Sequence, residues 1–285
     1  MADPFIALQH LLPRHALTRL VGRLAASERG WVKTPFIRSF ARAYGISLEE
    51  AERASFADYE SFNAFFTRAL REEVRPLEGD DQTLVSPVDG SVSQLGTISE
   101  GTLFQAKGNR YRLDELLGCR DGTAAERIAP YEGGRFATLY LAPSDYHRIH
   151  VPRLGTLIRS TAIPGTLFSV NGRTEAGIAN LFCQNERLAL EFETDQGPLA
   201  MVLVGALIVG SIETVFGTPP SPYRELAQST HRQTFTRGSE IGRFLLGSTV
   251  IVCTGPAEPP WRQELRAGSR VLVGQSLTQA LKGPA

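Results

Sequence analysis

Apolar residues near the amino terminus recur with the period of a helix. Two apolar stripes with steps of three and four residues predict two amphipathic helices, and Thr34-Pro35 marks the start of the second because proline suits a first helical turn. The range 47–50 (SLEE) has a capping-box pattern that predicts a third helix, and the phenylalanine-rich range 61–70 predicts a fourth. The stripes consist of Leu17, Leu20, Val21 and Leu24, and of Val32, Phe36, Phe40 and Tyr44.

Beyond residue 83 the pattern changes to short apolar runs separated by glycine and proline, which is typical of β-strands. Asp89-Gly90 between apolar residues predicts a hairpin turn, and the range 218–233 resembles an exposed loop. The fold class we expect is α+β, with a helical region over 1–75 and a β-rich body over 76–285 built of short antiparallel strands in a barrel-like or sandwich-like arrangement. Strands are expected within 83–95, 134–152, 186–194, 198–214, 244–254 and 268–278.

The range 243–252 (RFLLGSTVIV) resembles one buried strand with Gly-Ser-Thr in its middle. Glycine weakens a strand, and a buried hydroxyl needs a hydrogen-bonding partner. Leu246 and Val250 stand where the G-x-S-x-G motif requires glycine, which excludes the nucleophile elbow of the hydrolases. Ser248 is therefore a candidate for another kind of chemistry.

Charge is balanced over the chain but concentrated at one end. Thirty basic and thirty acidic residues give a formal net charge of zero, which argues against a nucleic-acid partner. Residues 1–45 contain seven basic and two acidic residues, a net of +5 that favours an anionic membrane surface. Two interpretations of the first helices stay open: a lid packed on the body, or an interfacial anchor with arginines towards lipid phosphate and Trp31 towards the acyl chains.

Cysteine usage and targeting signals indicate a reducing compartment. The three cysteines are far apart and form no C-x-x-C pair, so neither a disulfide framework nor a zinc knuckle is expected. The amino terminus lacks the order of a secretion signal, and the longest apolar run, 199–210, is too short to cross a bilayer. We expect a protein that is soluble or lies on a membrane surface.

Two histidines in one short segment, His147 and His150, flanked by Asp145 and Arg148, indicate an active site. No carboxylate or cysteine completes an obvious ligand set, and residues i and i+3 of an extended segment face opposite sides, so we expect no metal. A metal-dependent hydrolase that uses both histidines as ligands remains the alternative.

A catalytic relay is a further possibility. Asp89 alone is a common turn residue, but Asp89, His150 and Ser248 together could form a carboxylate–imidazole–hydroxyl relay. The carbonyl nearest to the Ser248 hydroxyl is that of Gly247, and attack on it would convert the amide to an ester. The missing side chain of glycine makes the required backbone geometry accessible.

In seven short motifs the chain resembles bacterial phosphatidylserine decarboxylases, from the amino-terminal helices nearly to the carboxy terminus. The resemblance implies a proenzyme that cleaves itself between Gly247 and Ser248 into a β chain, 1–247, and an α chain, 248–285. It also implies that Ser248 becomes an amino-terminal pyruvoyl group, the covalent cofactor. The motifs are FNAFFTRAL (62–70), PVDG (87–90), DYHRIH (145–150), GTLFSVN (165–171), NER (185–187), VGALIVGSIET (204–214) and LGST (246–249).

Roles for the site residues follow from the same resemblance. His150 matches the general base that acts on Ser248, and Asp89 matches the carboxylate that orients it. The pyruvoyl carbonyl would form a Schiff base with the substrate amine and accept electrons as carbon dioxide departs. His147 matches the residue that returns a proton to the carbanion. The positions implied to line the pocket are Phe168, Ser169 and Asn171.

The implied substrate is phosphatidylserine and the implied product phosphatidylethanolamine, so the enzyme would be a carboxy-lyase of phospholipid biosynthesis. It would act as a peripheral protein at the cytoplasmic face of the inner membrane, with its α and β chains paired as a heterodimer and a dimer of heterodimers left open. A non-enzymatic alternative is a lipoyl-carrier-like β domain, suggested by the rhythm of 268–277. A carrier needs a lysine at a hairpin tip, and the only lysine after residue 107 is Lys282, in the tail.

Overall fold

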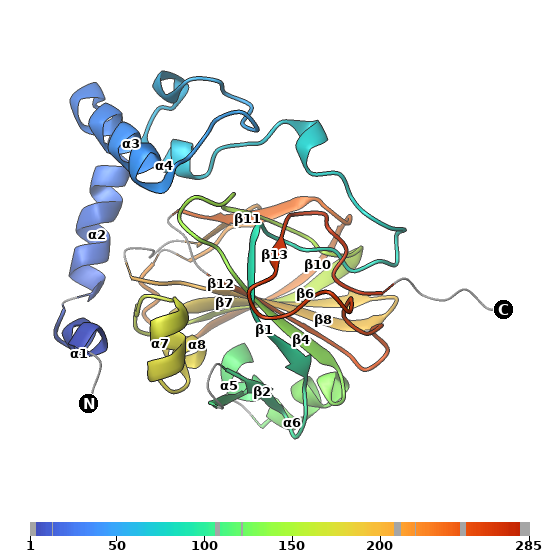
Figure 1. The fold of residues 1–285 in the computed structure, drawn as a ribbon. Coiled ribbons are helices and arrows are strands. Elements are labelled where there is room, and N and C mark those ends of the chain that lie inside the picture. Colours follow the sequence, from blue (N-terminus) through green and yellow to red (C-terminus); the bar gives the residue numbers. More distant parts are fainter. Residues whose placement is uncertain are drawn as a thin grey trace.

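A helical arm stands beside a β-rich body (Figure 1). The computed structural model describes residues 4–12, 14–105, 109–120, 122–207, 212–219, 221–245 and 249–279. The arm, residues 4–75, contains α1 (Pro4–Leu11), α2 (Arg14–Ala25), α3 (Gly30–Tyr44), η1 (Phe56–Asp58), α4 (Phe62–Phe66) and η2 (Glu72–Val74).

The body is built around an antiparallel sheet of eight strands with two free edges, in the order β10-β6-β7-β8-β12-β4-β1-β13. A second sheet has the order β5-β11-β9, and β2 pairs with β3. The predicted α+β class, with helices first and a body of antiparallel strands after them, is therefore confirmed. The strands of the large sheet are β1 (Gly90–Thr97), β4 (Arg135–Tyr140), β6 (Gly155–Ile163), β7 (Arg187–Thr194), β8 (Gly197–Val204), β10 (Ala227–Phe235), β12 (Thr249–Thr254) and β13 (Arg270–Val271). The others are β2 (Thr102–Phe104), β3 (Arg110–Arg112), β5 (Arg148–His150), β9 (Ile212–Thr214) and β11 (Glu240–Phe244), and the body's helices are α5 (Leu113–Leu117), α6 (Ala124–Ile128), η4 (Ala129–Tyr131), α7 (Gly172–Gly177) and α8 (Leu181–Gln184).

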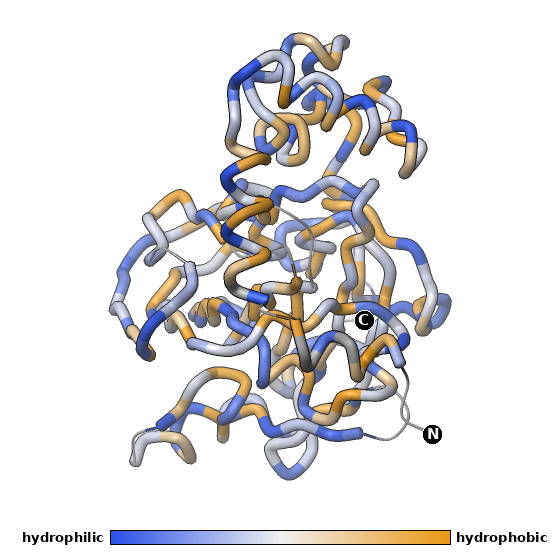
Figure 2. Tube along the Cα trace, turned by 90° about the vertical axis from the view of Figure 1, so that its left-hand side faces the viewer, coloured by the Kyte–Doolittle hydropathy of each residue, from blue (hydrophilic) through white to orange (hydrophobic). Residues whose placement is uncertain are grey.

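The middle strands of the large sheet are buried on both faces. Along β12, Val250 and Val252 belong to one hydrophobic core, while Ile251 and Cys253 belong to a second core on the opposite face. This is why β12 consists of consecutive apolar residues instead of alternating apolar and polar ones. Figure 2 shows apolar and polar segments interspersed along the whole described chain.

The arm partly buries one predicted stripe, whose last member Tyr44 is exposed, and exposes part of the other. Phe36 of α3 stacks on Phe62 of α4 with ring centroids 4.0 Å apart, so α3 packs against another helix of the arm. On α2, however, Leu20 and Leu24 are exposed, and Trp31 at the start of α3 is 75% exposed. Among the described residues, no helix is both long and apolar enough to cross a membrane.

Two local predictions in the first 90 residues are wrong. Ser47 accepts a hydrogen bond from the amide of Glu49 and forms a turn, and the chain then bridges from Ala51 to Leu70 instead of entering a helix. Asp89-Gly90 is not a hairpin turn, because Gly90 already begins β1. A Cβ at Gly90 would lie 2.4 Å from the carbonyl oxygen of Tyr140 on β4, so glycine is required for the close approach of these strands.

Three predicted segments divide differently in the structure. The range 243–252 is not one strand, because β11 ends at Phe244 in the small sheet and β12 begins at Thr249 in the large one. The range 198–214 likewise supplies β8 to the large sheet and β9 to the small one. The predicted loop 218–233 is a loop only in its first part, since β10 begins at Ala227 and pairs with β6.

Candidate functional site

His147 lies in a fully buried position at the junction of arm and body. Its Nδ1 donates to the carbonyl of Asp145 at 2.8 Å, and the ring of Phe66 on α4 lies 4.0 Å away, centroid to centroid. Among the residues that the structure describes, its Nε2 has no hydrogen-bond partner. Burial lowers the pKa of His147 to about 3, with the nearby charge of Arg68 acting in the same direction. The imidazole is therefore neutral near pH 7, with an unshared electron pair on Nε2.

His150 ends β5 and faces different partners. Its Nδ1 lies 2.7 Å from the carbonyl oxygen of Gly238, and its Nε2 lies 3.0 Å from the hydroxyl of Tyr146. Because a carbonyl can only accept, Nδ1 carries the proton, and in the neutral ring the Tyr146 hydroxyl donates to Nε2. Burial lowers the pKa of His150, opposed by the hydrogen bond to Gly238 and, more weakly, by the charge of Asp89.

Asp89 is buried just before β1, and its carboxylate is bound by Arg75 and by the chain near the carboxy terminus. Arg75 reaches it with Nε and Nη2 at 3.0 and 2.6 Å, and the amide of Val273 donates to Oδ1 at 2.8 Å. Burial lowers the pKa of Arg75, but its hydrogen bonds to Asp89 and Glu50 outweigh this and raise the pKa overall. Within the described chain no hydrogen bond joins Asp89 to His150, so the two residues are linked electrostatically.

The predicted cleavage bond lies outside the described residues, as do both Gly247 and Ser248. On one side, the amide of Phe244 donates to the carbonyl of His147 at 3.0 Å. On the other side, Thr249 pairs with Tyr140 on β4, and its buried hydroxyl has no partner within the described ranges. The last described residues before the predicted bond thus lie beside His147, and the first described residue after it begins β12.

The positions predicted to line the pocket lie where the amino-terminal helices meet the body. Phe168 is buried, and the guanidinium carbon of Arg14 lies 3.9 Å from its ring centroid. Ser169 is hydrogen-bonded twice to Gln9 of α1, at 2.8 and 2.9 Å. Asn171 caps α7. In the described part of the chain no hydrogen bond connects these three residues to the two histidines, and their binding role stays a prediction.

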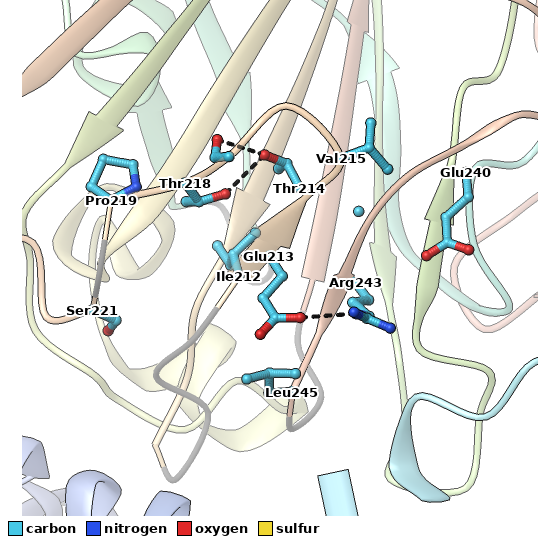
Figure 3. A pocket seen from close by; sticks show the side chains of 12 residues that line it. Ile212, Glu213, Thr214, Val215, Thr218, Pro219, Ser221, Glu240, Arg243 and Leu245 are labelled. Atoms are coloured by element: carbon cyan, nitrogen blue, oxygen red, sulfur yellow. Dashed lines mark hydrogen bonds and ion pairs between the residues drawn. The ribbon is translucent and has the colours of Figure 1, made fainter. Parts of the chain in front are cut away.

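A cavity of about 450 Å³ opens along β9 and β11. Figure 3 shows Glu213 and Arg243 directed towards one another across it, with their ion pair at 2.9 Å. Leu245, the last described residue before the predicted cleavage bond, lines the same cavity. The cavity is thus a space next to the segment where the cofactor is predicted to form.

Several site residues carry no clear signal in the sequence. Arg75 holds Asp89, Tyr146 holds His150, and Arg68 lies near His147, yet an arginine in a helical segment or a tyrosine between charged residues is common. Two of them lie inside the quoted motifs, Arg68 in FNAFFTRAL and Tyr146 in DYHRIH, but the sequence singles out neither as a site residue. Among the residues that the structure describes, no group of three or more His, Cys, Asp or Glu side chains could hold a metal ion.

Comparison with known proteins decides the family. The family model described as phosphatidylserine decarboxylase matches residues 62–279, and a second model described as PSD matches residues 4–45. The chain belongs to the phosphatidylserine decarboxylase family. Membership confirms the resemblance seen in the sequence and the predicted enzyme class, a carboxy-lyase.

Curated relatives extend the match to nearly the whole chain. A protein from Ectopseudomonas mendocina is 48% identical over 283 residues, covering 97% of this chain and 98% of its own length. One from Nitrosococcus oceani is 49% identical, covering 96% and 90%, and one from Alcanivorax borkumensis is 47% identical, covering 94% and 93%. All three are named phosphatidylserine decarboxylase proenzyme.

Proposed function

We propose that this chain cleaves itself between Gly247 and Ser248 and then converts phosphatidylserine to phosphatidylethanolamine. The observation that carries the proposal is the place of β12, which begins one residue after Ser248 and pairs with β4 on one side and β8 on the other. A cut before Ser248 leaves the new α chain held in the middle of the sheet. The cleaved product would therefore be a stable α/β heterodimer with its new terminus at the site.

Cleavage requires a base and an attack on the preceding carbonyl. The Ser248 hydroxyl loses its proton and attacks the Gly247 carbonyl, which exchanges the amide for an ester. β-Elimination removes the Cα proton of residue 248 and releases the Gly247 carboxylate as the new end of the β chain, which leaves dehydroalanine. Tautomerisation to the imine and its hydrolysis by water then give the pyruvoyl group and ammonia. We assign His150 as the base because its ring is neutral and its Nε2 is unprotonated: Nε2 would take the Ser248 proton in place of the hydrogen bond from Tyr146, with the Asp89 charge stabilising the imidazolium that forms.

The flanking residues fit a pyruvoyl group at position 248. Among the described residues, the buried hydroxyl of Thr249 and the buried Nε2 of His147 have no partner: the hydroxyl could donate to a carbonyl oxygen of the group, and the unprotonated Nε2 could accept a proton or an N–H donor there. When present, the pyruvoyl group supplies an electron sink after condensation with the substrate amine. His147 would return the proton to the substrate carbon, since an anion beside Nε2 raises the pKa of the ring and favours its protonated form.

The arm provides the proposed contact with the membrane. Leu20 and Leu24 of α2 and Trp31 of α3 expose apolar surface, and Arg19 and Arg23 are exposed on the same helix as the two leucines. Apolar side chains combined with arginines suit an interface with anionic lipid. We place the enzyme as a peripheral protein at the cytoplasmic face of the inner membrane, where the lipid can present its head group while its tails stay in the bilayer.

Intact masses of the purified chains test the proposal directly. Wild-type protein should give a β chain ending at Gly247 and an α chain that is one ammonia lighter than residues 248–285. Ser248→Ala should give a single chain of about 31 kDa, in line with the mass of the sequence, without decarboxylase activity. Ser229→Ala, at an exposed serine of β10, is the control and should be processed normally. A single uncut wild-type chain that still decarboxylates phosphatidylserine would refute the proposal.

A further inference from the structure

Arg68 is a buried cation with no acid to pair with among the described residues. Only 7% of the residue is exposed, Nη2 donates to the carbonyl of Ser144 at 3.0 Å, and Nη1 has no partner in the part of the chain that the structure describes. The charges of Asp89 and Asp145 act on it through space. Both carboxylates are already engaged, Asp89 by Arg75 and Asp145 by Arg270, so neither neutralises Arg68.

Arg68 and His147 are anchored side by side and leave one nitrogen each unused. Arg68 is held by the carbonyl of Ser144 and His147 by the carbonyl of the next residue, Asp145. The unused atoms are Nη1 of Arg68 and Nε2 of His147, both shielded from solvent. Phe66 covers the imidazole and Phe65 lies 5.7 Å from the guanidinium carbon, so the surroundings are apolar and strengthen any charge interaction.

The free N–H group of a buried guanidinium can bind an anion. The free nitrogen of a neighbouring imidazole can exchange a proton with a carbon of the same ligand. We propose that Arg68 binds the phosphodiester of the serine phospholipid while His147 faces its reacting carbon, an inference that rests on the proposed function. In that substrate the phosphorus is three bonds from the carbon that loses carbon dioxide. A donor to the phosphate and an acid for the carbon must therefore be neighbours, as Arg68 and His147 are.

The phosphodiester suits Arg68 better than the serine carboxylate does. The carboxylate loses its charge as carbon dioxide leaves, so a guanidinium bound to it would stabilise the ground state more than the transition state. The phosphodiester keeps its charge through substrate, transition state and product. Binding it fixes the head group without raising the barrier, and its negative charge offsets the effect of Arg68 on the pKa of His147.

Arg68→Met tests the assignment in the full-length, self-processed enzyme. Loss of a hydrogen-bonded charge pair predicts a rise in KM for a short-chain phosphatidylserine of roughly 10- to 100-fold, with kcat within about threefold. Arg68→Lys keeps the charge but not the fork of donors and should fall between Met and wild type. Arg71→Met is the matched control, since Arg71 is half exposed and pairs only with exposed Glu73. Intact masses report whether each variant folds and is processed, and wild-type cleavage and activity test the proposed function separately.

Two soluble probes separate phosphate from carboxylate. Glycerophosphoethanolamine carries the phosphodiester without the carboxylate, and L-serine carries the carboxylate without the phosphate. In Arg68→Met the inhibition constant of the first should rise by the same factor as KM, while that of L-serine should not change. A selective loss of L-serine inhibition, an equal loss of both, or an unchanged KM in a fully processed Arg68→Met enzyme would each overturn the assignment.

Discussion

The body buries most of its apolar residues, whereas the arm leaves several of its own exposed. In the body, every residue of β12 from Thr249 to Thr254 is buried, and neighbouring positions contribute to two separate cores. In the arm, α2 leaves Leu20 and Leu24 in solvent. Internal packing therefore accounts for the residues of the body, whereas part of the arm has a surface that only an external apolar partner can cover.

The two regions meet at the site. The last residues of the arm bind the histidine segment directly, since Arg68 donates to Ser144 and Arg148 donates to the carbonyl of Thr67. The boundary predicted at residue 75 coincides with the arginine that binds Asp89 of the body. The end of the arm thus forms part of the site, and only its first helices have the exposed surface of an anchor.

The largest effect is expected at this junction. Arg75→Met leaves the Asp89 carboxylate buried with one backbone partner, and breaking a buried ion pair costs about 3–5 kcal/mol. The measurement is denaturant unfolding in the Ser248→Ala background, which keeps the chain in one piece. Arg71→Met, which removes an exposed pair, should change the unfolding free energy by less than about 0.5 kcal/mol. Equal losses in the two variants would show that Arg75 does not couple arm and body.

A smaller effect on stability is expected for His147 when the pH is lowered. Its pKa is about 3 in the folded chain and about 6.5 when unfolded, so the unfolded state binds more protons between these values. The free energy of unfolding is therefore highest, as far as His147 is concerned, above pH 6.5, and it falls as the pH is lowered towards 3. Between pH 6.5 and 5 the unfolding free energy should fall by about 2 kcal/mol because of His147.

The corresponding variant is His147→Asn in the Ser248→Ala background. Its unfolding free energy should fall less steeply over this range than that of the parent, measured by urea unfolding at fixed pH values. His231→Asn, at a partly exposed histidine of β10, should keep the parental slope. An unchanged slope in His147→Asn would show that His147 is not held neutral.

The sequence predicts well what depends on local pattern. The consecutive apolar residues of β12 indicate a strand covered on both faces, and the stripe of α3 indicates a helix with one partly buried side, because both are set by side-chain period. The histidine pair can be recognised because two histidines stand three residues apart in the sequence. These features need no knowledge of what lies across the sheet.

What the sequence does not predict depends on contacts between distant segments. The range 243–252 reads as one strand, yet its halves join different sheets, since nothing local reports that β11 pairs with β5 and β12 with β8. The sequence likewise does not indicate which residue binds Asp89. Arg75 is one of many arginines, and only the tertiary fold brings it to Asp89.

The smallest effect on stability is expected on the exposed face of the arm, and there the comparison between the regions is sharpest. Leu20→Ser/Leu24→Ser removes apolar surface that is already in solvent, so the unfolding free energy should change by less than about 0.5 kcal/mol per site. Binding to vesicles of anionic phospholipid, measured by co-sedimentation, should weaken by roughly tenfold or more, since each buried leucine contributes about 1.5–3 kcal/mol when it leaves water. The matched control, Phe104→Ser/Leu154→Ser, changes two exposed apolar residues of the body and should leave vesicle binding intact. If the body variant loses binding and the arm variant does not, the lipid contact belongs to the body, and the exposed leucines of α2 need another explanation.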